Sequence, residues 1–213
     1  MTETIKIGAK SDSDLRIAGS LFLFAGILFY LVNMMAESIY PNYNDGSNYL
    51  SDLGARSAPS MLLWDSMLFT FGIIFIASTH FYLRRTGNKL MMVTFIISGI
   101  GTIIVSLFPE NSILAVHTVG AEAAFLFGGI SAMLAYRVTR PPFRYFVLIL
   151  GIITLASDFL LFIGIYFGLG VGGMERMVVY PEMAFLMALG GYLLNSHSLS
   201  AQDQSSSERD RLC

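Results

Sequence analysis

Six long apolar runs, separated by short polar segments, limit what this chain can fold into more than any other feature. A helix needs about 20 mainly apolar residues to cross a bilayer, and these runs are apolar on all sides rather than along one stripe. Only 13% of the residues are charged, against about 25% in an ordinary soluble domain. The sequence therefore predicts an all-α polytopic membrane bundle of six transmembrane helices. The expected spans are 17–36, 61–83, 90–108, 113–136, 143–167 and 178–194.

Basic residues predict how the bundle is oriented. With six spans, 11 of the 13 lysine and arginine residues fall on one side, and only Arg56 and Arg176 fall on the other. Loops rich in lysine and arginine stay in the cytoplasm, so both termini are expected there, in a multi-pass protein of the plasma or inner membrane. We expect a cytoplasmic segment over 1–16, a membrane domain over 17–194 and a disordered cytoplasmic tail over 195–213.

Several classes of function are disfavoured. A net charge of −2 argues against a nucleic-acid partner, which requires a basic face. Cys213 is the single cysteine, so neither an internal disulfide nor a cysteine-based metal site is available. Zinc-protease, phosphate-loop and serine-hydrolase motifs are missing. A carboxylate-rich site could bind Ca²⁺ or Mg²⁺, but no ligand spacing identifies one, so no metal or cofactor is indicated.

Ionisable residues inside the spans are the first candidates for a site, because a charge in mid-bilayer costs about 2.5–3.5 kcal/mol on insertion scales. At about 1.5 Å of rise per residue, all five fall in the outer half, which predicts a polar cavity open outward. Plainer interpretations remain: first-turn carboxylates at Asp65 and Glu182, and hydrogen-bonded packing groups at the others. The five are Asp65, His117, Glu122, Asp158 and Glu182.

The fourth span carries small residues at every fourth position, namely Gly120, Ala124, Gly128 and Ala132. This spacing allows another helix to approach closely, so the fourth span is expected to be central or to bind a partner. At 100° per residue, roughly 140° separates His117 from Glu122. The two side chains are therefore expected to face different neighbours.

Two outer connections are distinctive. The segment 37–60 is long and polar, and it either lies on the bilayer surface or forms a lid over an outward pocket. The segment 168–176 contains four glycines, which indicates a flexible hinge or a tight backbone approach.

Four short motifs follow one another on the outer side. They are Ser47-Asn48-Tyr49-Leu50-Ser51-Asp52-Leu53-Gly54, then Phe108-Pro109-Glu110, then His117-Thr118-Val119-Gly120-Ala121, and finally Gly173-Met174-Glu175-Arg176 before Tyr180-Pro181-Glu182. This order resembles the bacterial and archaeal membrane family called domain of unknown function 998, over nearly the whole chain. It is more distantly similar to DRAM-like and Frag-like membrane proteins.

The resemblance implies a six-helix membrane domain and brings no known reaction. It implies a shared outer surface made of Ser51, Asp52, Gly54, Pro109, Glu110, His117, Glu175 and Arg176. The distant relatives are linked to lipid remodelling or membrane trafficking, which hints at a lipid ligand. Zinc-dependent ceramidase-like hydrolases carry several histidines that this chain lacks.

Three functions stay open, and the sequence does not decide whether the protein is an enzyme. In the first, an outward pocket binds or modifies a membrane lipid, with His117 as acid–base group and Arg176 on a phosphate. The second is an ion-coupled permease that uses Asp158 and Glu122, and the third is a structural subunit with a membrane-protein partner or a second copy. The catalytic candidates are His117, Asp65 and Asp158. The binding candidates are Ser51, Asp52, Glu110, Glu122, Glu175, Arg176 and Glu182.

Overall fold

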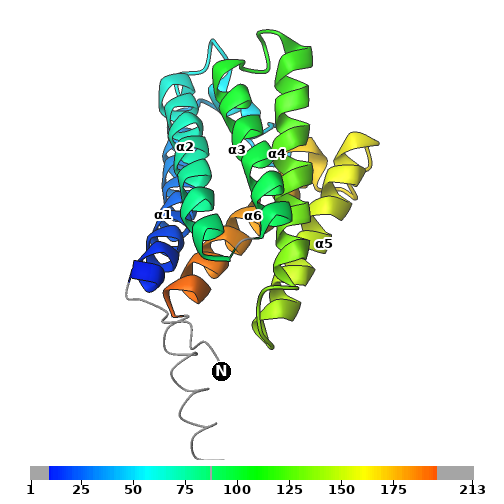
Figure 1. Cartoon of the computed structure of the whole chain (residues 1–213). Helices are drawn as coiled ribbons and strands as arrows, with labels where there is room; N and C mark the ends of the chain where they lie inside the picture. Colours follow the sequence, from blue (N-terminus) through cyan, green and yellow to red (C-terminus); the bar gives the residue numbers. More distant parts are fainter. Residues whose placement is uncertain (1–9, 87, 196–213) are drawn as a thin grey trace, which may run out of the picture.

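The computed structural model describes residues 10–86 and 88–195, and this part of the chain is entirely helical apart from its connections. All six α-helices are long and apolar enough to cross a membrane, which confirms the predicted all-α membrane bundle (Figure 1). A 3-10 helix, η1, lies between the first two. The elements are α1 Lys10–Ile39, η1 Ser51–Gly54, α2 Met61–Thr86, α3 Lys89–Leu107, α4 Leu114–Ala135, α5 Phe143–Phe162 and α6 Gly170–Leu194.

The helices form a closed ring in chain order. Each packs against the next, and α6 crosses the bundle diagonally to return to α1, touching α4 on its way (Figure 1). The start of α1 and the end of α6 lie together at one end, called here the terminal end. The α1–α2 and α3–α4 connections lie at the opposite end, called here the η1 end. The predicted placement of both termini on one side is consistent with this arrangement, and which side is cytoplasmic stays a prediction.

Facing glycines set the distances between several helices. A Cβ atom on Gly19 of α1 would lie 2.7 Å from the carbonyl oxygen of Gly190 in α6. A Cβ atom on Gly101 of α3 would lie 2.5 Å from the carbonyl oxygen of Gly120 in α4. The small-residue stripe of α4 is thus buried inside the bundle, as its spacing predicts. The most buried helix, however, is α6 rather than α4.

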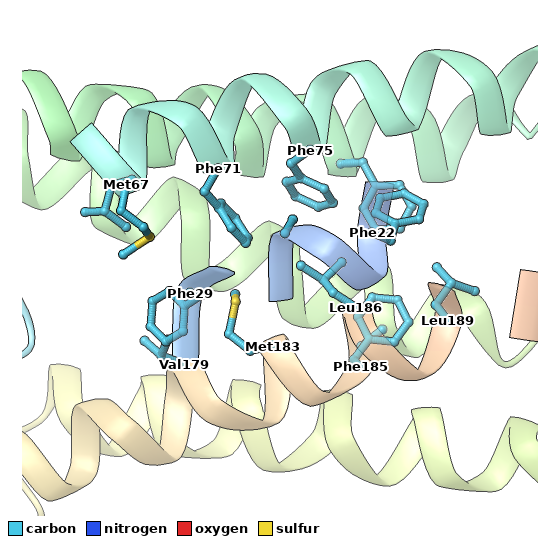
Figure 2. Packing of buried hydrophobic residues seen from close by; sticks show 14 of the residues in the cluster. Phe22, Phe29, Met67, Phe71, Phe75, Val179, Met183, Phe185, Leu186 and Leu189 are labelled. Atoms are coloured by element: carbon cyan, nitrogen blue, oxygen red, sulfur yellow. The ribbon is translucent and has the colours of Figure 1, made fainter. Parts of the chain in front are cut away.

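A hydrophobic core runs along the bundle between α1, α2, α3 and α6, and packed aromatic rings fill it in the terminal half (Figure 2). Phe22 of α1 lies 5.7 Å from Phe75 of α2, and Phe75 lies 5.1 Å from Phe95 of α3, between ring centroids. Phe185 of α6 stacks on Phe95. These rings are less than 2% exposed, so the interior between α1, α2, α3 and α6 is apolar where they pack.

The boundaries of the last two helices differ from the prediction. Helix α5 ends at Phe162 rather than at 167, and α6 begins at Gly170 rather than at 178. The glycines of this segment allow a close approach of two backbones, because Gly172 lies against the carbonyl oxygens of Asp45 and Asn48 where no Cβ atom would fit.

At the other end of the chain, α1 begins at Lys10, inside the segment 1–16. The predicted disordered tail lies outside the described residues except for its first residue.

The earlier start of α6 changes the depth of Glu182. This residue lies at the middle of the 25-residue helix, so neither a position in the outer half nor a first-turn role fits it. Pro181 is inside the helix instead of near its start. A proline is tolerated within a membrane helix where neighbouring groups satisfy the backbone. Pro181 leaves the carbonyl of Met177 without its helical donor. Nearby, Thr154 of α5 donates to the carbonyl of Val178, and Tyr30 of α1 donates to the carbonyl of Tyr180.

Candidate functional site

A cavity of about 70 Å³ lies between η1 and helices α1, α2, α3, α4 and α6. A single water needs roughly 10–15 Å³, so the cavity has room for several waters or one small polar group. Its walls are mostly apolar, with aromatic side chains from α1, α2 and α4. The polar residues that line it are Ser51, Thr102, His117, Glu175 and Glu182.

His117 is held in one orientation in the first turn of α4. Its Nδ1 lies 2.8 Å from the carbonyl oxygen of Phe108, the residue that caps the end of α3. Because a carbonyl oxygen only accepts, Nδ1 carries the proton of the neutral ring, and Nε2 is left as a hydrogen-bond acceptor. The side chain is 7% exposed and lines the cavity. This is the geometry of a general base that a backbone group orients.

Glu182 lines the cavity in the middle of the bundle. Its Oε1 lies 3.4 Å from the hydroxyl of Ser98 in α3, and the carboxyl group rests against Gly128 of α4, where a Cβ atom would collide with it. The residue is 5% exposed. The sequence predicts Gly128 to be a helix-packing residue. In the structure, its missing side chain leaves the space that the buried carboxyl group of Glu182 occupies.

Glu175 joins α6 to η1, which forms the roof of the cavity. Its carboxyl group accepts a hydrogen bond from the backbone N–H of Leu50, the residue that precedes η1. Ser51 donates to Oε2 of Glu110 at 2.8 Å, so the roof is also tied to the α3–α4 connection. Asp52 accepts from the backbone N–H of Tyr49 at 3.0 Å and also hydrogen-bonds with Glu110. Glu175 and Ser51 face the cavity, whereas Asp52 and Glu110 support the roof.

Glu110 makes the roof sensitive to pH. Burial, followed by its hydrogen bond with Asp52, raises the pKa of Glu110 to about 7, while the Ser51 hydroxyl opposes the shift. A carboxyl group with a raised pKa stabilises the fold most at low pH, and this contribution is lost as the pH rises through about 7. We expect the thermal midpoint in detergent to fall between pH 5 and pH 8, and Glu110→Gln to flatten that fall. Equal slopes in the two proteins would contradict the assignment.

Arg176 fastens the α1–η1 connection to α6 instead of lining the cavity. Its Nη1 donates to the carbonyl oxygens of Asp45 and Gly172 at 2.9 and 3.1 Å. Its Nη2 donates to Glu37 at 2.7 Å and to the hydroxyl of Tyr43 at 2.9 Å. The predicted phosphate-binding arginine thus has internal acceptors on both terminal nitrogens.

The remaining predicted residues lie outside the cavity wall. Asp65 of α2 packs against Gly54 of η1. Asp158 of α5 is 7% exposed, its Oδ1 has no hydrogen-bond partner, and it interacts electrostatically with Glu122 and Glu182. The prediction that His117 and Glu122 face different neighbours is confirmed, since Glu122 interacts with α5 while His117 lines the cavity.

Helix α3 adds a row of buried hydroxyl groups that were not among the predicted site residues. Thr94, Ser98, Thr102 and Ser106 recur at every fourth position, and all four are buried. Ser98 contacts Glu182 and Thr102 lines the cavity. Their spacing in an otherwise apolar span is a signal that they share one helix face. Among residues 10–86 and 88–195, no group of three or more His, Cys, Asp or Glu side chains is placed to hold a metal ion.

Residues 23–192 match the sequence profile of a family described as protein of unknown function (DUF998). The chain belongs to the DUF998 family. The match runs from α1 to α6, so the DUF998 region includes every residue that lines the cavity. No curated protein and no solved structure matches the chain. The predicted membership is confirmed, and the likeness to DRAM-like and Frag-like proteins stays a prediction.

Proposed function

We propose that this DUF998 protein binds a lipid or another amphiphile, with the polar end of the ligand in the cavity. The observation that carries the proposal is the composition of the cavity: buried polar groups of His117, Glu175 and Glu182 lie within walls that are largely aromatic and aliphatic. Binding sites for small molecules commonly combine an apolar lining with a few placed polar groups. Following the distribution of basic residues, the η1 end faces outward from the plasma or inner membrane.

The alkyl chain would leave the cavity sideways, because about 70 Å³ receives a head group but not a whole lipid. Ala121 and Phe125 of α4 line the cavity and are only partly buried. Gly129 lies one turn beyond Phe125 on the same face and packs against Leu155 of α5. Phe125 therefore lies on the side of α4 that faces α5, which packs against both α4 and α6. We place the exit of the chain at Phe125.

The aromatic core favours a binding site over a channel. Rings of Phe22, Phe75 and Phe95 fill the interior between α1, α2 and α3 on the terminal side of the cavity. A ligand that enters from the η1 half meets this layer as a floor. His117 is then the group that we propose to exchange a proton with the bound molecule, since its Nε2 is an acceptor inside the cavity.

Filling the cavity tests this function. Ala121→Phe places a large side chain in the cavity wall, and native mass spectrometry of the purified protein is expected to show retained amphiphile reduced by about tenfold, a loss of about 1.4 kcal/mol in binding. The matched control is Val119→Phe on the same helix, because Val119 is 68% exposed on the lipid-facing side. Equal retention in wild type and both variants, or none in wild type, would argue against the proposal.

A second function has one specific observation in its favour. Glu122, Asp158 and Glu182 interact electrostatically in succession, from the α4–α5 interface to the cavity, and the Oδ1 atom of Asp158 has no partner. Such a row of carboxyl groups is suited to passing protons in a coupled permease. Proton flux into liposomes that is abolished by Asp158→Asn would favour the permease over simple binding.

A further inference from the structure

We infer that the head group received by the cavity is a hydrogen-bond donor with positive charge, a primary amine, in place of a phosphate or carboxylate. This inference rests on the proposed function and names the class of ligand. The reason is that the cavity wall has several unfilled hydrogen-bond acceptors and few free hydrogen-bond donors.

The polar atoms open to the cavity are mainly acceptors. His117 presents Nε2, because its Nδ1–H is used on the carbonyl of Phe108. Glu182 has one oxygen near Ser98, and the other has no hydrogen bond within the described residues. Glu175 uses one oxygen on the N–H of Leu50, and the second oxygen is without a hydrogen bond in that same part of the chain. Three side chains from α4 and α6 thus line the cavity with acceptors unfilled.

The donors around the cavity are used elsewhere. The hydroxyl of Ser51 donates to Glu110 at 2.8 Å, and that of Thr102 donates to the backbone carbonyl of Ser98 at 3.1 Å. Both terminal nitrogens of Arg176 are bound to the α1–η1 connection and to α6. Of the lining side chains, the indole N–H of Trp64 is the donor that remains. An anionic head group would therefore meet two carboxyl groups and no available cation.

His117 supplies the observation that is independent of the carboxyl groups. It is more than nine-tenths buried, its ring is fixed by the α3–α4 connection, and its unpartnered acceptor nitrogen lines the cavity. A buried acceptor without a donor is costly, and so is a buried carboxylate without a counter-charge. A primary ammonium brings three N–H donors on one compact charge. It can donate to the imidazole nitrogen or to a carboxylate, and it brings the counter-charge that an alcohol lacks.

Three probes with the same alkyl chain test the inference: dodecylamine, dodecanol and dodecanoate. Binding to the protein in nanodiscs at near-neutral pH is measured by native mass spectrometry over a range of probe concentrations. We expect dodecylamine to bind about tenfold more tightly than dodecanol, and dodecanoate to bind most weakly. Glu182→Gln is expected to remove most of this preference while dodecanol binding stays within about threefold, because the amide keeps the size of the side chain but not its charge.

A matched control is Asp65→Asn, which removes a carboxyl group of α2 that lies outside the cavity wall and should leave the preference unchanged. His117→Ala provides a second test that does not depend on a carboxyl group, and it should also weaken dodecylamine binding. Equal binding of the three probes, or an amine preference that survives both Glu182→Gln and His117→Ala, would overturn the inference and leave the proposed function standing. Failure of all three probes to bind the wild-type protein would overturn the proposed function itself.

Discussion

Replacing Arg176 by leucine is expected to lower the thermal midpoint of the protein by on the order of 10 °C. Removing one partner of a buried ion pair costs about 3–5 kcal/mol, because the other charge is left uncompensated. In a protein of this size, 1 kcal/mol corresponds to a shift of roughly 2–4 °C. The variant leaves Glu37 without its cation, and the carbonyl of Asp45 loses a donor.

The geometry of Arg176 explains why lysine should not replace it. The guanidinium group donates through Nη1 to backbone carbonyls and through Nη2 to Glu37 and Tyr43, in two directions at once. A single ammonium at the end of a flexible stem cannot reproduce that planar fork. Arg176→Lys is therefore expected to lose most of the stabilisation, and both variants should expose residues 40–50 to limited proteolysis.

Arg56→Gln is the matched control for this prediction. Arg56 lies between η1 and α2, but its side chain is exposed, and its bond to Asn111 is made by the backbone N–H, which the substitution keeps. Its thermal midpoint should stay within about 2 °C of wild type, as for most surface substitutions. If Arg176→Leu and Arg56→Gln have equal effects in differential scanning fluorimetry, the role assigned to Arg176 is wrong.

Gly101→Ala is expected to destabilise the bundle by about 3 kcal/mol, although alanine is the better helix former. The added Cβ atom would lie 2.5 Å from the carbonyl oxygen of Gly120 and 2.6 Å from the backbone nitrogen of Ala124. Both atoms belong to the backbone of α4, so no side chain can rotate away, and α3 and α4 must separate. Because Thr102 of α3 and His117 of α4 both line the cavity, the separation should also weaken ligand binding.

Gly191→Ala makes the same chemical change where space is available. No atom lies within 4 Å of the position of a Cβ atom on Gly191 in α6. The variant should be as stable as wild type or more stable by up to about 1 kcal/mol, from helix propensity alone. Thermal unfolding of the two variants in one detergent measures the difference. Comparable stability would show that α3 and α4 are not held at the distance that Gly101 sets.

Some residues of the candidate site can be predicted from their type and their place in an apolar span, and others cannot. His117 stands out in the sequence as an ionisable group in an apolar run, and the structure places it in the cavity wall. Asp65 and Asp158 stand out for the same reason, yet they lie outside that wall. The sequence shows that an ionisable residue is unusual within an apolar span. It does not show which way the helix is turned or which neighbour the side chain meets.

The sequence alone determined that this chain is a bundle of six membrane helices, because the length and apolarity of each run are local properties set against the thickness of a bilayer. Only the tertiary structure decided which polar groups meet. The placement of Ser51, Glu175 and Glu182 around one cavity depends on where α6 begins, how it tilts and which glycines it packs against. These are relations between segments far apart in the chain, fixed by close backbone contact, and hydropathy along one run carries no record of them.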